Sequence, residues 1–142
     1  MVTALGGFYM LSTWIRRGGI RQQRSGTSRL PAPVLFGHFA LAAIGLVVWI
    51  GYVVADRSAL AWTSFGLLLP VALLGFVMLA RWIPVHRDRA GVAAPAATTA
   101  PGADESVPAE PHFPVVVVLA HGLFAVVTLA LGLLTALGIG IG

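Results

Sequence analysis

The chain lacks cysteine and lysine and contains few charged residues, and each shortage excludes a class of protein. Without cysteine there is no disulfide, thiolate metal site, iron–sulfur cluster or covalently attached haem. Charged residues make up 10% of the sequence, whereas hydrophobic residues make up 58% and the mean hydropathy is +0.90. A soluble domain of 142 residues has too little interior to hide so much apolar surface. The composition therefore predicts an integral membrane protein.

The sequence also lacks the residue patterns of common active sites and transport sites. It contains no nucleotide-binding loop, no zinc-ligand spacing and no hydroxyl nucleophile with an obvious base. No acidic residue lies inside a long apolar segment, which argues against an ordinary proton- or cation-coupled transporter. The net charge of +4 comes from arginines that flank apolar segments, a pattern of membrane topology and not of nucleic-acid binding. Nothing here indicates an independent enzyme.

Four apolar segments organise the chain. The segments 33–54, 61–83 and 114–140 are long enough for a helix to cross a hydrocarbon core of about 30 Å. In lipid they should be helical, because every backbone polar group needs an internal partner. We expect a membrane region at 1–89 with helices at about 1–15, 33–54 and 61–83, a flexible Ala/Pro-rich linker at 90–112, and a fourth transmembrane helix at 113–142.

Two pairs of segments repeat. The block GFYMLSTWI at 7–15 matches GFVMLARWI at 75–83 in six of nine positions, an offset of 68 residues. The block HFALA at 38–42 resembles HGLFA at 121–125, an offset of 83. The difference, 83 − 68 = 15 residues, falls in the Ala/Pro-rich linker. We therefore predict an all-α membrane four-helix bundle made of a duplicated helical hairpin, with an axis along the membrane normal.

The repeat also bears on the first segment, 1–15, which is too short to span a membrane comfortably. The third segment begins near residue 61, so its counterpart would begin near 61 − 68 = −7. About eight residues of the first helix are thus expected to be missing. Either the start lies further upstream or this helix is short.

Each copy of the hairpin contains one histidine inside its second apolar segment, His38 and His121. Both lie a few residues after a proline, so the imidazoles are expected at a similar depth, roughly 8–11 Å along their helices. Two neutral imidazoles can hold the iron of a b-type haem from opposite sides. The residues expected to complete such a site are small residues on the same helix faces, which leave a slot, and arginines for the propionates: Ala42, Gly45, Ala125, Thr128, Arg29 and Arg81.

The histidine pattern allows two other roles. Each imidazole can form a hydrogen bond to a neighbouring helix, worth about 0.6–2 kcal/mol in a membrane, and duplication copies such a structural histidine as well. The pair can also handle protons or a substrate. His86, in a charged loop, and His112, just before the fourth helix, lie outside the apolar segments and are not expected to bind a metal.

With this bundle layout and histidine pair, the chain resembles the bis-histidine four-helix membrane cytochromes, namely the b561 type and the membrane anchors of succinate dehydrogenase. The resemblance implies haem b and electron transfer. Cytochromes of the b561 type usually hold two haems on four histidines, and this chain lacks a second intramembrane pair. The chain also looks like small multi-pass membrane proteins of high-GC bacteria. The alternative function is a structural or accessory subunit without a cofactor, which binds a larger membrane complex or a second copy.

Arginines cluster after the first and third apolar segments, whereas the turn between the second and third contains only Asp56 and Arg57. By the positive-inside rule both arginine loops are cytoplasmic and both termini lie outside, which suits a multi-pass protein of a bacterial inner membrane. Trp14 and Trp82, at matching positions of the repeat, are expected to anchor their helices at the cytoplasmic interface.

Reporter fusions test this topology. Eight of the nine arginines lie in or beside the two loops, so fusions at Gly26 and Ala100 should give a cytoplasmic signal. A fusion at Gly142 should give a signal from the outside. A cytoplasmic signal at Gly142 would exclude the proposed orientation.

Overall fold

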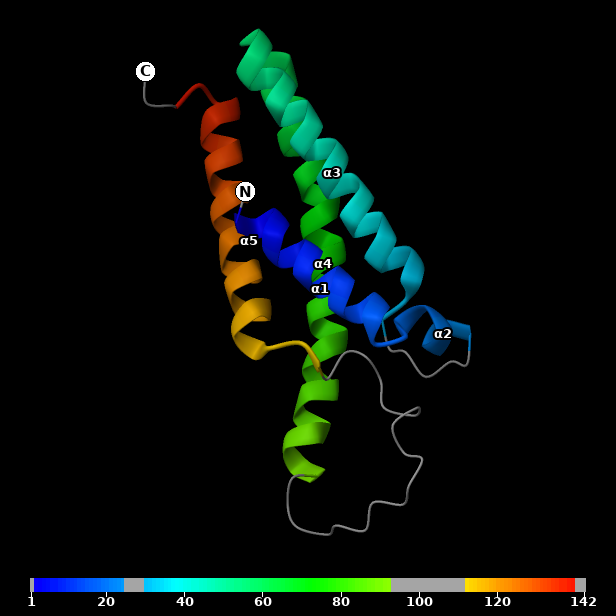
Figure 1. Cartoon of the computed structure of the whole chain (residues 1–142). Coiled ribbons are helices and arrows are strands. Elements are labelled where there is room, and N and C mark those ends of the chain that lie inside the picture. Colours follow the sequence, from blue (N-terminus) through cyan, green and yellow to red (C-terminus); the bar gives the residue numbers. More distant parts are fainter. Residues whose placement is uncertain (1, 25–29, 93–111, 140–142) are drawn as a thin grey trace.

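The computed structural model describes residues 2–24, 30–92 and 112–139, which form five helices (Figure 1). The helices are α1 (Val2–Arg16), α2 (Gly19–Arg24), α3 (Ala32–Ala55), α4 (Ser58–Val92) and α5 (Val115–Ala136). These residues include no strand, so the all-α prediction is confirmed. Three stretches are long and apolar enough to cross a membrane, namely α3, α5 and Ser58–Pro84 of α4.

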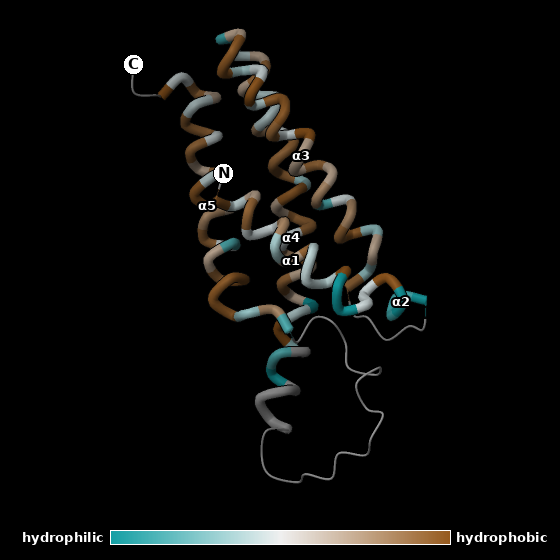
Figure 2. Tube along the Cα trace, in the orientation of Figure 1, coloured by the Kyte–Doolittle hydropathy of each residue, from teal (hydrophilic) through white to brown (hydrophobic). Residues whose placement is uncertain are grey.

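The three membrane-length stretches expose their apolar side chains. Only 6% of the most apolar window of each is buried inside the protein. Large side chains such as Val47, Leu73 and Val116 are more than two-thirds exposed, and hydrophobic residues run along the length of these helices (Figure 2). Water would not tolerate such a surface, whereas lipid would. These are the features of a membrane protein.

The long helices lie side by side, and α1 crosses in front of them (Figure 1). The antiparallel pair α3 and α4 packs along most of its length, and α5 packs on α4 and runs in the direction of α3. The reversal between α3 and α4 occurs at Asp56, which adopts a left-handed conformation with φ 48°. Helix α1 contacts α5 along its first part and reaches α3 at its end.

Two helices differ in length from the usual membrane span. With 15 residues, α1 covers only about 22 Å, as its sequence predicts. In contrast, α4 contains 35 residues and continues past the expected end at 83 to Val92, with Pro70 and Pro84 inside it. Residues 90–92 are therefore helical and not part of a linker. The rest of the predicted linker, 93–111, lies outside the residues that the structure describes.

Helices α3 and α5 begin in the same way. Each has a proline as its N-cap, Pro31 with φ −64° and ψ 127°, and Pro114 with φ −61° and ψ 125°. Each proline carbonyl accepts two backbone hydrogen bonds, of 3.0 and 3.1 Å in both helices. The two histidines follow their caps at one distance, 38 − 31 = 121 − 114 = 7 residues. His38 and His121 therefore lie at matched depth, about 10 Å along their helices.

A buried cluster closes the end of the molecule where α1 finishes and α3 and α5 begin. It consists of Trp14, Leu30, Trp82 and Phe113. Its members form two pairs separated by the repeat offsets, 82 − 14 = 68 and 113 − 30 = 83. Trp14 is fully buried and Trp82 is 6% exposed. The prediction that these tryptophans face the membrane interface is wrong, because Leu30 and Phe113 cover the indoles from the two loops.

Small residues hold α3 against α4 at the other end. Ser64 of α4 is buried and its hydroxyl donates to the Gly45 carbonyl of α3 at 3.1 Å. Gly45 also approaches Leu67, where an added Cβ would lie 3.7 Å from the leucine Cβ. Close backbone approach with a hydrogen bond is a usual way of joining helices in lipid, where no hydrophobic force draws them together.

Gly19 makes room for the buried cluster, because a Cβ at this position would overlap the indole ring of Trp14. The substitution Gly19→Ala should therefore displace the indole and lower the free energy of unfolding by about 1–3 kcal/mol. Gly66→Ala is the matched control, since a Cβ there meets nothing within 4 Å. Thermal unfolding in detergent, followed by tryptophan fluorescence, measures both. Unchanged unfolding of Gly19→Ala would contradict the packing described.

Candidate functional site

His38 of α3 is oriented by a hydrogen bond to the backbone of α4. Its Nδ1 lies 2.9 Å from the carbonyl oxygen of Val71. A carbonyl only accepts, so Nδ1 is the nitrogen that donates its hydrogen. In the neutral ring the other nitrogen, Nε2, then has a free lone pair. Half-buried His38 is thus held as a potential metal ligand through Nε2.

His121 of α5 is held in the same way by α1. Its Nδ1 donates to the carbonyl oxygen of Thr3 at 3.0 Å. The two acceptors are separated by the offset of the first repeated block, 71 − 3 = 68, and the two donors by that of the second, 121 − 38 = 83. The two hydrogen bonds therefore occupy equivalent positions, and both rings adopt the same tautomer.

A glycine lies beneath each imidazole. A Cβ added to Gly75 would lie 3.3 Å from Cε1 of His38, and one added to Gly7 would lie 3.2 Å from Cε1 of His121. Each glycine comes one turn after the accepting carbonyl, 75 − 71 = 7 − 3 = 4. Helical side chains lean toward the preceding turn, so a side chain at either position would crowd that carbonyl. Glycine leaves the carbonyl open to the histidine.

The sequence contains a signal for these glycines, although it does not identify them as partners of the histidines. Gly7 and Gly75 begin the two matching nine-residue blocks. A glycine retained in both copies of a helix indicates a position where another group approaches closely.

The two imidazoles lie against each other. Their ring centroids are 6.3 Å apart and their planes are inclined at 61°. Helices α3 and α5 stand on opposite sides of the group, with α1 and α4 between them (Figure 1). Two imidazoles on opposite sides of one metal ion, each nitrogen about 2 Å from the metal, place their ring centres roughly 6 Å apart. The spacing of His38 and His121 therefore fits a shared metal centre.

The small residues expected around the pair contact other helices. Gly45 belongs to the α3–α4 crossing described above. Thr128 donates to the Phe124 carbonyl at 2.7 Å and lies 3.3 Å from the hydroxyl of Thr3. Ala42 and Ala125 are half-buried.

The remaining candidates lie away from the pair in sequence and differ in environment. Arg81 is exposed on α4, and Arg29 lies outside the residues that the structure describes. His86 stacks on Trp82 with centroids 5.0 Å apart and an angle of 13°. His112 lines a separate cavity together with two arginines. Neither His86 nor His112 is found in contact with His38 or His121 by the interactions described here.

Comparisons of the chain with protein-family models, with curated proteins and with solved structures find no match. The function of the histidine pair therefore has to be inferred from its own chemistry.

Proposed function

We propose that the protein transfers electrons in a membrane and that His38 and His121 hold one b-type haem. The observation that supports this function is the pair of imidazoles 6.3 Å apart, each with its Nδ1 hydrogen fixed on a backbone carbonyl. Histidines that bind metals usually donate their other ring N–H to a carbonyl or carboxylate, which sets the tautomer and orients the ring. Both Nε2 lone pairs are then left for a metal.

Haem suits this pair better than a bare ion. Among the described residues there is no group of three or more His, Asp or Glu side chains that could hold a metal. Two imidazoles suffice for haem iron, because the porphyrin provides the other four nitrogens. When bound, the haem supplies a one-electron couple. Arg81 is the described candidate for pairing with a propionate.

The chain's own residues would hold the two axial ligands rigidly. Thr3 and Val71 fix the ring orientations through their carbonyls, and Gly7 and Gly75 let each ring sit against its neighbouring helix. The hydrogen bonds also make the imidazoles more basic and so better ligands. The surrounding apolar helices exclude water from the pair.

We also infer that the pair arose by duplication of a hairpin, with α1 and α3 as one copy and α4 and α5 as the other. The equivalent hydrogen bonds, the proline caps and the paired residues of the buried cluster support this inference. The second helix of each copy packs on the first helix of the other copy. An approximate twofold axis along the membrane normal would then present two like ligands to one ligand-binding position.

A structural or accessory subunit is the second candidate function. Each histidine already has a hydrogen-bond partner and packs on a glycine, which is what a helix-joining residue requires. Such a bond contributes about 0.6 kcal/mol on average in a membrane protein. In that case the protein binds a larger complex and has no cofactor of its own.

Absorbance of the purified protein separates the two functions. Protein expressed with added haem precursor should show the Soret and α bands of a low-spin b haem on reduction. His38→Ala or His121→Ala should abolish the low-spin haem, because one imidazole cannot fill both axial positions. His86→Ala and His112→Ala are the controls and should keep it. A colourless wild-type protein, together with tolerated His38→Asn and His121→Asn variants, would favour the accessory subunit.

Gly75 provides a test that leaves both histidines in place. In Gly75→Val the new side chain would crowd His38 and its acceptor carbonyl on Val71. Haem affinity should fall about tenfold, the scale on which second-shell changes act on metal sites. Gly122→Val is the matched control, since nothing lies within 4 Å of a Cβ at Gly122. Haem titration of the two variants in detergent measures the difference, and equal affinities would argue against the axial role of His38.

A further inference from the structure

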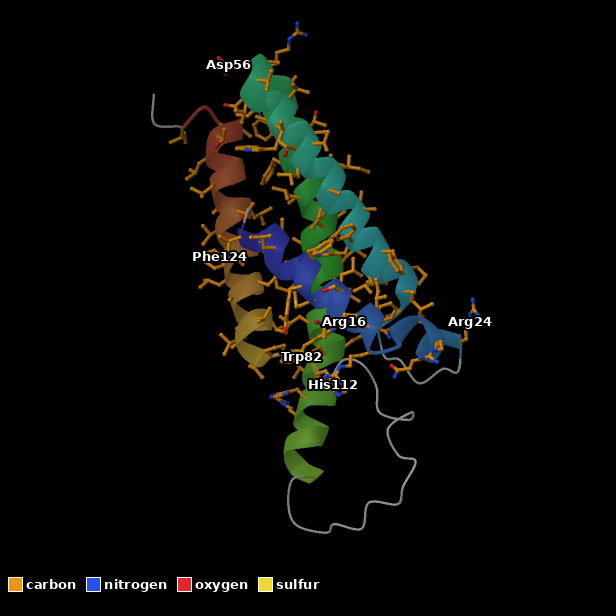
Figure 3. The ribbon with its side chains drawn as sticks, viewed as in Figure 1. Arg16, Arg24, Asp56, Trp82, His112 and Phe124 are labelled. Atoms are coloured by element: carbon orange, nitrogen blue, oxygen red, sulfur yellow. The ribbon has the colours of Figure 1, made fainter. Side chains whose placement is uncertain are left out.

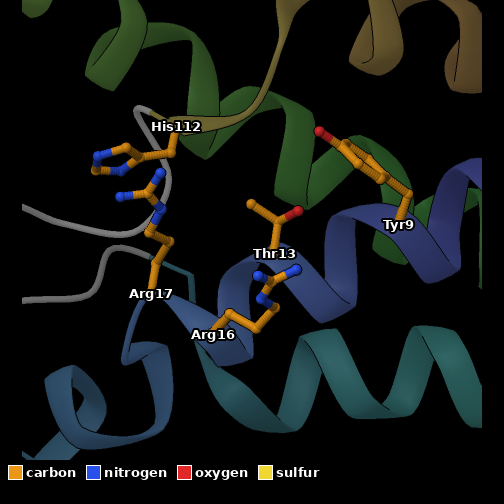
Figure 4. Close-up of a pocket in the computed structure, with 5 residues that line it drawn as sticks. All are labelled: Tyr9, Thr13, Arg16, Arg17 and His112. Carbon is orange, nitrogen blue, oxygen red and sulfur yellow. The ribbon is translucent and has the colours of Figure 1, made fainter.

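A cavity of about 420 Å³ lies at the arginine-rich end of α1, far along the helix from the contact with His121 (Figure 4). Its lining consists of Tyr9, Thr13, Arg16, Arg17 and His112. All but the last come from α1 or the residue after it, and His112 comes from the segment before α5. Arg16 and Arg17 are exposed, so the cavity is reached from outside. Its volume falls within the roughly 300–1,000 Å³ of small-molecule sites.

The lining is cationic and rich in hydrogen-bond donors. The guanidinium of Arg17 lies beside the imidazole of His112, and the hydroxyls of Tyr9 and Thr13 face the same space (Figure 4). Nδ1 of His112 is buried and has no hydrogen-bond partner among the described residues. No carboxylate belongs to the lining. Two guanidinium groups with neighbouring donors match the oxygens of a phosphate.

The position of the cavity also favours a negatively charged lipid. Asp56 lies at the opposite end of the molecule from Arg16, Arg24 and His112 (Figure 3). The cavity therefore sits at the positive end, where apolar α1 meets its first arginine. Phe8 and Ile15 of α1 are exposed close by in the sequence and offer apolar surface to acyl chains. Phosphates of a bilayer lie at this boundary between apolar and charged residues.

We propose that this cavity binds the phosphate of an anionic phospholipid headgroup. Arg16 and Arg17 pair with the phosphate oxygens, and Tyr9, Thr13 and His112 form hydrogen bonds with the oxygens of the headgroup. Free inorganic phosphate offers the same oxygens but no acyl chains to lie along α1. The site is separate from the histidine pair, and it exists whether or not a haem is bound there.

Lipid binding to the full chain tests the proposal. Purified protein is titrated with phosphatidylglycerol or phosphatidylcholine, and native mass spectrometry counts the lipid retained. Wild type should prefer phosphatidylglycerol, and the double variant Arg16→Gln/Arg17→Gln should bind it about tenfold or more weakly. The control is Arg21→Gln/Arg24→Gln, which removes the same charge from α2 outside the cavity lining and should change binding less than twofold. Equal losses in the two double variants would reveal a diffuse surface attraction and overturn the proposal.

Two further arms keep the result decisive. Tyr9→Phe/Thr13→Val retains the charge and should weaken phosphatidylglycerol binding a few-fold, so unchanged binding would overturn the proposal even if the arginine variant fails to fold. Inorganic phosphate should displace the lipid only at concentrations far above the lipid's own. Displacement at equal concentration would identify a site for free phosphate in place of a lipid headgroup.

Discussion

The arrangement of the helices depends on polar contacts that one helix makes with the backbone of the next. Between apolar helices in lipid there is little hydrophobic force, so close packing and hydrogen bonds must hold them together. Each histidine bonds a helix carbonyl that a glycine one turn later leaves uncovered. Ser64 bonds the Gly45 carbonyl of α3 in a similar manner. In all three places a small residue allows a polar side chain to reach a backbone oxygen.

Much of the fold follows from the sequence, because length and hydropathy determine which segments cross lipid. The spans 33–54 and 61–83 correspond closely to α3 and to Ser58–Pro84. The matched depth of His38 and His121 also follows, since both positions are counted from a proline that starts a helix. These features depend on local spacing, which a single sequence contains.

Other features depend on which helices become neighbours, and spacing alone does not determine that. Any of several carbonyls could accept from His38, and the choice of Val71 depends on the register between α3 and α4. The inward orientation of Trp14 depends on Leu30 and Phe113, which come from distant loops. The end of α4 at Val92 lies beyond the apolar run, where hydropathy gives no boundary.

The two histidine contacts have different consequences for the order in which the protein is assembled. The bond from His38 to Val71 joins residues 33 apart, within helices that are made one after the other. The bond from His121 to Thr3 joins residues 118 apart, so the first helix to leave the ribosome must wait for the last. The α3–α4 pair can therefore form early, while α1 remains without its main partner. The pair of imidazoles is completed only when α5 has inserted, and any group held between them enters a site that closes at the final step of biogenesis.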